Sequence, residues 1–218
     1  MMAHFLMQAI AGAARRRAAE SSSYAFSDDF ESYADSDAAT ASNDWTTTGT
    51  PVFGYATSPL EGVRSLAINN TSTATTRLIS TAGSDTWVYF LFRVNDTSIG
   101  QHIVSILASD GTTVAAFVDF LAGGAVRAKS GTGLPGDTDS ETISMNTLFH
   151  VWIRHSVTEG KIDVYISLSS TRPSVPTISD SGSTSQLSYI RFGPSASLKT
   201  LVWDKLRVSA SEIGNDPD

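Results

Sequence analysis

The chain contains 218 residues, of which 41% are hydrophobic and 17% are charged, and its formal net charge at pH 7 is −7. It has no cysteine, which excludes a disulfide scaffold, a cysteine-ligated zinc site and a thiol nucleophile. The acidic balance argues against nucleic-acid binding, and no apolar run is long enough for a transmembrane segment. The length fits one all-β domain, which can reach about 250 residues.

The first 23 residues differ in composition from the rest of the chain and predict a short N-terminal α-helical arm. They are rich in alanine, and apolar side chains spaced as on one helical face precede three arginines: Phe5, Leu6, Ile10, Arg15, Arg16 and Arg17. Because an isolated helix this short is marginal in water, we expect the arm to dock on a partner protein. An accessory helix without a partner and a helix on a membrane surface are the alternatives.

The order of charge and hydrophobicity in this arm opposes a secretion signal. A secretory signal places its basic residues before the apolar stretch, whereas the arginines here follow it. We therefore predict that the protein carries no export signal.

From residue 24 onward, short apolar runs alternate with turn residues, as in an all-β domain. The predicted domain spans residues 24–214, with a tail over 215–218. The predicted strands are 25–31, 52–55, 65–68, 75–80, 86–94, 102–108, 113–121, 125–130, 141–144, 149–157, 161–168, 187–192 and 200–208. Three polar stretches are predicted to be loops, namely 35–44, 131–139 and 171–185.

Two pairs of these strands are predicted hairpins. Asp110-Gly111 joins strands 102–108 and 113–121, and Glu159-Gly160 joins strands 149–157 and 161–168. In strand 86–94 every second side chain is apolar and is expected to face the core: Val88, Phe90, Phe92 and Val94. Long hairpins among many short strands predict antiparallel sheets packed face to face.

Four motifs, in this order along the chain, resemble those of the concanavalin A-like jelly roll, in particular laminin G-like and related lectin and glucanase domains. They are FSDDFE at 26–31, Trp45 with EGVRSL at 61–66, the central strands 86–121, and LVWDKLRV at 201–208 followed by SEIG at 211–214. The resemblance implies an antiparallel β-sandwich whose first and last strands lie side by side. Because this fold hosts lectins, glycosidases and structural modules, it does not decide the function.

The sequence predicts no catalytic residues. Glucanases of this fold carry a Glu-x-Asp-x-x-Glu strand, and none of the glutamates here begins that pattern. The chain also lacks a Gly-x-Ser-x-Gly elbow and a phosphate-binding loop. His150 and His155 lie five residues apart on one predicted strand, so they point to opposite faces and make a poor metal site. We therefore predict that the protein is not an enzyme.

Calcium is the one cofactor for which the sequence offers candidates. The resemblance implies a calcium site at one edge of the sandwich, and Asp28, Asp29 and Asp204 are acidic residues within the motifs. Carboxylate oxygens suit calcium, yet no contiguous ligand loop is present. Capping of the opening strand through hydrogen bonds is the alternative role for Asp28 and Asp29.

Glycan binding needs an aromatic ring on which a sugar can stack. Trp45, Trp152 and Tyr165 are candidate stacking residues, together with Tyr55. Each of them also fits a place in the core or a cross-strand aromatic pair.

These observations favour a non-enzymatic structural or binding module that its arm docks on a larger assembly. By analogy with other jelly rolls, the predicted assembly is a phage virion, with the chain as a head decoration, fibre or tail protein assembled in the host cytoplasm. Its partners would be capsid or tail proteins, and it would form a homo-oligomer if three-fold packing applies. A lectin-like module that binds cell-surface glycans is the first alternative, and a glycoside hydrolase with an unrecognised site is the second.

Overall fold

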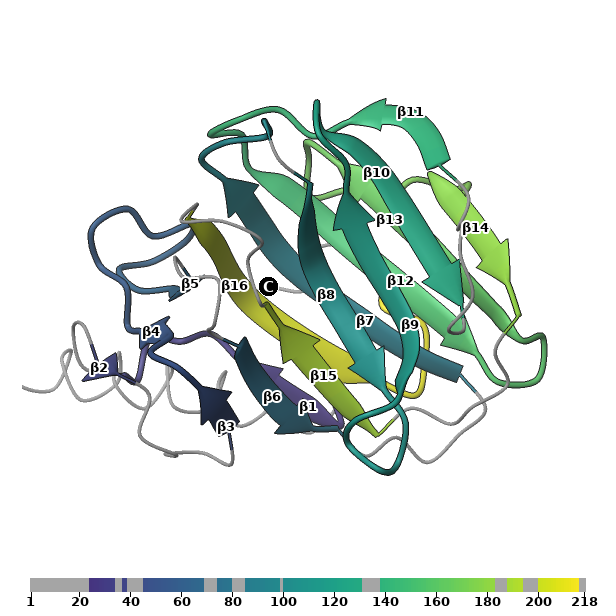
Figure 1. Ribbon diagram of the computed structural model, residues 1–218, viewed down its shortest axis with the longest axis horizontal. Helices are drawn as coiled ribbons and strands as arrows, with labels where there is room; N and C mark the ends of the chain where they lie inside the picture. The colour runs from purple at the N-terminus through teal and green to yellow at the C-terminus, as the bar shows by residue number, and fades with distance from the viewer. Residues whose placement is uncertain are drawn as a thin grey trace, which may run out of the picture.

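The computed structural model describes residues 24–33, 37–38, 45–68, 74–79, 85–98, 100–130, 138–182, 188–193 and 200–215. Within them, two antiparallel sheets pack face to face, as Figure 1 shows. The all-β sandwich predicted from the sequence is therefore confirmed. The predicted arm, with Phe5, Leu6, Ile10 and its three arginines, lies outside the described residues. No helix in the described part of the chain is long and apolar enough to cross a membrane.

One sheet has nine strands in the order β14-β13-β12-β7-β16-β5-β4-β2, and β1 also pairs with β16. Its strands are β1 (Phe26–Asp28), β2 (Asp37–Ala38), β4 (Val52–Phe53), β5 (Leu66–Ile68), β7 (Asp85–Val94), β12 (Phe149–Ser156), β13 (Lys161–Ser167), β14 (Ile178–Ser181) and β16 (Leu201–Ser209). The strands β7, β12 and β16 form its centre. The expected pairing of the first and last strands is confirmed, because Phe26 lies opposite Val208.

The other sheet has seven strands in the order β11-β10-β9-β8-β15-β6-β3. They are β3 (Trp45–Thr48), β6 (Ala74–Leu78), β8 (Gln101–Leu107), β9 (Val114–Phe120), β10 (Ala125–Ser130), β11 (Thr138–Thr142) and β15 (Tyr189–Phe192). Both predicted hairpins are present, as β8–β9 and β12–β13. At the first turn, Asp110 Oδ1 accepts the backbone N–H groups of Thr112 and Thr113, and Gly111 has a φ of 67°.

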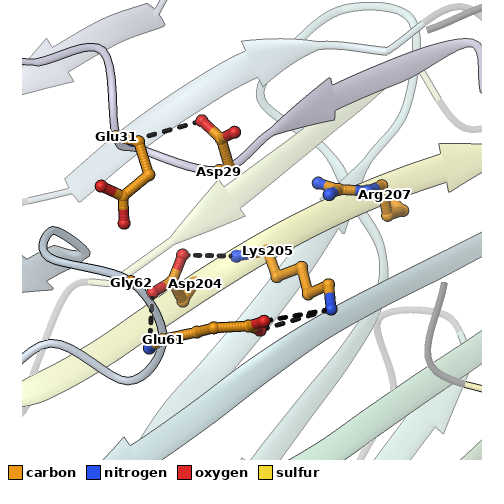
Figure 2. A pocket seen from close by; sticks show the side chains of 7 residues that line it. All are labelled: Asp29, Glu31, Glu61, Gly62, Asp204, Lys205 and Arg207. Atoms are coloured by element: carbon orange, nitrogen blue, oxygen red, sulfur yellow. Dashed lines mark hydrogen bonds and ion pairs between the residues drawn. The ribbon is translucent and has the colours of Figure 1, made fainter. Parts of the chain in front are cut away.

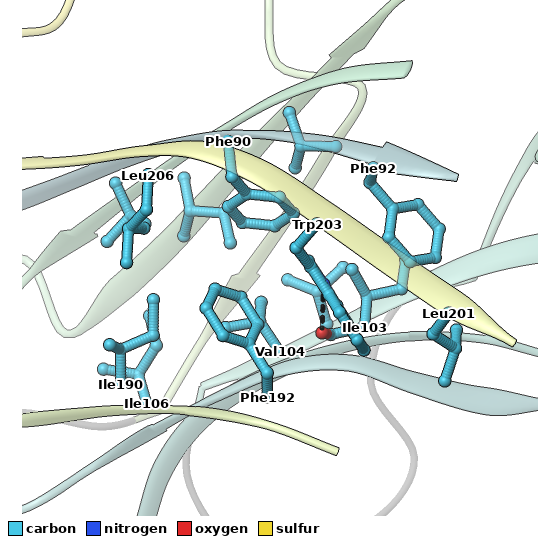
Figure 3. Close-up of a cluster of buried hydrophobic side chains, with 14 of the residues drawn as sticks. Phe90, Phe92, Ile103, Val104, Ile106, Ile190, Phe192, Leu201, Trp203 and Leu206 are labelled. Carbon is cyan, nitrogen blue, oxygen red and sulfur yellow. Dashed lines mark hydrogen bonds between the residues drawn. The ribbon is translucent and has the colours of Figure 1, made fainter. Parts of the chain in front are cut away.

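The core lies between the sheets and is rich in aromatic side chains (Figure 3). Phe90 and Phe92 project into it from β7, as the alternation predicted, and Trp203 from β16 lies between Phe92 and Phe192. The indole Nε1 of Trp203 donates to the Ile103 carbonyl over 3.1 Å, so this buried polar atom is satisfied. The contact ties the two sheets together at the middle of the sandwich.

Two short strands, β2 and β14, lie where the sequence predicted loops, and a third, β11, begins at the end of the predicted loop 131–139 and overlaps the predicted strand 141–144. All three form the outer edges of their sheets. An edge strand pairs on one side only and has little apolar surface to bury, so a polar sequence suffices for it. The prediction that 35–44, 131–139 and 171–185 are loops is therefore wrong where these three strands lie.

Candidate functional site

The last strand, β16, breaks its own alternation in the middle. The register against β7 shifts between Asp204 and Arg207, and Lys205 adopts a left-handed φ of 51°. This β-bulge inserts one residue, so Trp203 and Leu206 both reach the core although they are three positions apart. Asp204 and Lys205 consequently lie next to each other on the outer face of the nine-stranded sheet.

A cavity of about 340 Å³ opens at this bulge (Figure 2). We call it the bulge pocket; it is lined by Asp29, Glu31, Glu61, Gly62, Asp204, Lys205 and Arg207. It lies where the neighbour of β16 changes, because β5 pairs with the strand before the bulge and β1 pairs with it after the bulge. Three of the four family-like motifs thus meet at one place.

The carboxylates of the bulge pocket hold the loop that precedes β5. Glu31 Oε1 accepts the backbone N–H groups of Val63 and Arg64, at 2.9 and 3.1 Å. Asp204 Oδ2 accepts the Glu61 N–H at 3.1 Å and the Ser65 hydroxyl at 2.8 Å. Figure 2 shows the dashed bond from Asp204 to Glu61. The Asp204 contacts join chain segments about 140 residues apart, and the Glu31 contacts attach the same loop to the segment after β1.

The Asp204 carboxyl group is buried deeply enough to change its titration. Burial raises its pKa to about 7, since the loss of hydration outweighs the hydrogen bonds from Ser65, Lys205 and Glu61. The Lys205 ammonium group in the pocket pairs with Glu61 instead, with Nζ 3.3 Å from Oε2. Asp204 therefore gains or loses a proton near neutral pH while its oxygens remain turned towards the loop.

The three aspartates considered for calcium have separate roles in the structure. Asp28 accepts bonds from the Phe30 N–H, the Tyr33 hydroxyl and the Trp45 indole, at 2.9, 2.8 and 3.0 Å. Asp29 and Asp204 line the bulge pocket, whereas Asp28 does not. Among the described residues, no group of three or more His, Asp or Glu side chains is placed to hold a metal ion. The capping role that the sequence offered as the alternative for Asp28 is the one its hydrogen bonds show.

The aromatic residues considered for sugar stacking are buried. Trp45 is 1% exposed and belongs to the main core. Trp152 and Tyr165, at 0% and 8% exposure, belong to a second cluster, which we call the outer cluster: Trp87, Tyr89, Leu91, Trp152, Tyr165 and Ile213. The Arg172 guanidinium lies 4.9 Å from the Tyr165 ring centre. None of the three rings offers an open face to a sugar in this structure.

A second cavity, of about 370 Å³, lies at the start of β16. We call it the amide pocket; it is lined by Tyr55, Ser58, Arg93, Asn95, Asn146, Thr200 and Val202. Arg93 comes from β7 and Val202 from β16, where the two residues pair across the sheet. The loop between β4 and β5 supplies Tyr55 and Ser58, and its later part, at Glu61 and Gly62, lines the bulge pocket.

Backbone and side-chain bonds fix the lining of the amide pocket. Asn95 Oδ1 accepts the Thr200 N–H at 2.9 Å, which leaves the Asn95 Nδ2 group as a hydrogen-bond donor. Asn146 has a left-handed φ of 55°, and its N–H donates to the Val94 carbonyl. The Arg93 guanidinium donates through Nη2 to the Ser58 carbonyl at 2.5 Å and to its hydroxyl at 3.0 Å. The pocket thus presents fixed polar groups beside the half-buried ring of Tyr55.

Sequence reasoning selected Tyr55 and missed Arg93, Asn95 and Asn146 as site residues. Tyr55, Arg93 and Asn146 lie far apart along the chain, and no motif joins them. One local signal was present: Arg93 is the charged residue among the apolar side chains that end strand 86–94.

No family model and no curated protein matches the sequence. Solved structures match it in fold. A sialidase is 13% identical with a TM-score of 0.55, and the match covers 70% of this chain and 16% of the sialidase. The structure titled "Cell entry of botulinum neurotoxin type C is dependent upon interaction with two ganglioside molecules" is 10% identical with a TM-score of 0.53, covering 78% of this chain and 43% of that one.

The exoplasmic/lumenal domain of VIP36, in a form bound to Ca²⁺ and Man, is 10% identical with a TM-score of 0.52. The match covers 80% of this chain and 86% of that domain. These chains share the concanavalin A-like jelly-roll type of β-sandwich. The present chain has that fold, as the motifs predicted.

Proposed function

We propose that this protein is a non-enzymatic glycan-binding module and that the amide pocket is its binding site. The observation that carries the proposal is the convergence of the Tyr55 ring with Arg93, Asn95 and Asn146 around one open cavity. Sugars present C–H faces that pack on aromatic rings and hydroxyl groups that need fixed donors and acceptors. The amide pocket offers both within a volume typical of small-molecule sites, about 300–1,000 Å³.

The fold of the chain supports the same proposal. One neighbour is a lumenal domain bound to Man, and another is titled for its interaction with gangliosides. At 10% identity these neighbours support the class of ligand and leave its identity open. The lectin-like alternative therefore ranks above the virion-surface role, which rests on the composition of residues 1–23 and stays a prediction.

A glycan array with the full chain tests the proposal. We expect binding to at least one class of glycan, and loss of that binding in Tyr55→Ala and Asn146→Gly. Glycine suits the left-handed backbone of Asn146, so this variant removes the amide without adding strain.

Tyr189→Ala and Asn215→Ala are matched controls, because they remove the same side-chain types outside both pockets. They should bind as the unmodified chain does. A chain that binds no glycan contradicts the proposal, and release of free sugar from the bound glycan would show an enzyme instead.

A further inference from the structure

The amide pocket has an unbalanced charge. Arg93 is the charged residue among its seven lining residues, and no carboxylate lines the cavity. The guanidinium is only partly exposed, so solvent screens its charge less than at an open surface. A cation placed in this way favours an anionic ligand.

Two other arginines on the sheets, Arg127 and Arg154, are paired with carboxylates. Arg127 Nε donates to Asp119 at 2.9 Å, and Arg154 contacts three carboxylates, those of Asp85, Glu159 and Asp163. Their positive charges are neutralised within the chain.

Arg93, in contrast, donates its hydrogen bonds to the neutral Ser58. Among the described residues no carboxylate lies within 4.0 Å of it. Only Nη2 is engaged, so Nε and Nη1 keep N–H groups for a ligand.

The neutral side chains of the pocket add further hydrogen-bond donors. Because Asn95 Oδ1 is occupied by the Thr200 N–H, the Asn95 side chain offers its Nδ2 donors to the cavity. The Asn146 amide, which is exposed, lies on the same lining and has donors of its own. The pocket therefore offers donors from Arg93, Asn95 and Asn146 to the acceptor oxygens of a ligand.

We propose that the amide pocket recognises an acidic glycan, with Arg93 binding a carboxylate or sulfate group of the sugar. This inference rests on the proposed function and specifies its ligand. The planar guanidinium matches the two oxygens of such a group, and charge-assisted hydrogen bonds of this kind are about twice as strong as neutral ones. Asn95 and Asn146 then bind neighbouring hydroxyl groups, and Tyr55 packs on the sugar ring.

Binding measured by calorimetry with matched pairs of oligosaccharides tests the inference. Each pair differs in one group: sialyllactose against lactose, a glucuronic acid-capped against a glucose-capped oligosaccharide, and a sulfated against an unsulfated galactoside. We expect the full chain to bind the acidic member of at least one pair about tenfold more tightly or better. The carboxylate pairs and the sulfate pair separate the two sources of the anion.

Two variants of Arg93 test whether this residue causes the preference for the acidic oligosaccharide. Arg93→Gln removes the charge and should abolish the difference in affinity between the acidic and the neutral oligosaccharide. Arg93→Lys keeps the charge but lacks the planar guanidinium with its two parallel donors, so it should retain part of that difference. Arg64→Gln is the matched control, because it makes the same change on the adjacent loop without lining either pocket. A thermal melt confirms that each variant is folded.

The outcomes distinguish the inference from the proposed function. Equal binding of acidic and neutral members by the unmodified chain overturns the acidic ligand and leaves a glycan-binding module. A preference that survives in the folded Arg93→Gln variant also overturns the inference. If the chain binds no glycan at all, both fail. Even if a variant does not fold, the relative affinity of the unmodified chain for acidic and neutral oligosaccharides still tests whether the ligand is acidic.

Discussion

At the scale of single residues, three carboxyl groups stabilise the structure around the sites by accepting hydrogen bonds from neighbouring segments. Asp28 holds Trp45 and the turn after β1, Glu31 holds the backbone at Val63, and Asp204 holds Ser65. All three come from motifs that resemble the family pattern, and their contacts explain what acidic side chains do at those positions. Burial raises the pKa of Asp204 to about 7.

The titration of Asp204 predicts how stability depends on pH. Burial raises its pKa from 3.8 to about 7, so between these values the folded state binds more protons than the unfolded state. The contribution of this group to the free energy of unfolding is fully present below about pH 4 and is lost as the pH rises through 7. The total loss is at most about 4 kcal/mol, at about 1.4 kcal/mol per pKa unit.

The asparagine of Asp204→Asn cannot ionise, so this variant should lose the part of the pH-dependent decrease in the free energy of unfolding that Asp204 causes. Denaturant unfolding from pH 4 to pH 8 measures it as the difference between the variant and the unmodified chain. Asp110→Asn is the control, because hydrogen bonds to Thr113 and Thr112 lower the pKa of Asp110 to about 2, outside the window. An unchanged slope in Asp204→Asn would show that Asp204 is ionised throughout this range.

At the scale of elements, the loop between β4 and β5 links the two pockets. Its first part lines the amide pocket through Tyr55 and Ser58, and its later part lines the bulge pocket through Glu61 and Gly62. The backbones of Tyr55 and Ser65 also bond to each other, at 2.8 and 3.2 Å. Because Glu31 and Asp204 fix one end of this loop, we expect them to hold the rim of the amide pocket in place.

Gly62 is the point at which this loop tolerates least change. It has a φ of 60°, and a Cβ added there would overlap the Glu31 carboxylate. Gly62→Ala should therefore lower the free energy of unfolding by about 1–3 kcal/mol and weaken glycan binding. Calorimetry and denaturant unfolding measure the two effects.

Gly123→Ala is a matched control for the backbone strain alone. Gly123 has a φ of 90°, and an added Cβ would meet no atom within 4 Å. We expect a smaller loss of stability and unchanged binding there. Equal effects of the two substitutions on stability would show that the Glu31 contact adds nothing to the strain.

The elements also show which features a sequence reveals. The long central strands were predictable because they alternate apolar residues. The edge strands β2 and β14 were not, because polar edge strands resemble loops, and β11 was predicted only in its second half. The bulge of β16 left a visible trace: the core residues Leu201 and Trp203 occupy odd positions, and Leu206 and Val208 occupy even ones. The amide pocket left only the isolated signals of Tyr55 and Arg93, since folding alone brings these residues and Asn146 together.

At the scale of the whole molecule, the two outer faces differ. The amide pocket, the bulge pocket and the outer cluster all lie on the nine-stranded sheet, along β16 and β7. On the seven-stranded sheet, by contrast, Arg127 is paired with Asp119 across β9 and β10. The nine-stranded sheet is therefore the face on which we place ligand binding, and an assembly that leaves this face open is compatible with it.

The predicted docking role of residues 1–23 can be tested by deletion. All sixteen described strands lie between Phe26 and Ser209, and the first pairs with the last, so deletion of residues 1–23 removes no described strand. We expect the deleted chain to fold with a melting temperature within a few degrees of the full chain and to bind glycans equally well. We also expect it to lose any partner that co-purifies with the full chain.

A full-length variant with serine at Phe5, Leu6 and Ile10 separates the apolar face of the arm from its arginines. If docking uses the apolar face, this variant loses the partner, whereas alanine at Arg15, Arg16 and Arg17 weakens the association in a salt-dependent way. A deleted chain that assembles as before would contradict the anchoring role of the arm. A deleted chain that unfolds would show instead that the arm belongs to the domain, because removing a packed segment exposes apolar surface that the sandwich needs to bury.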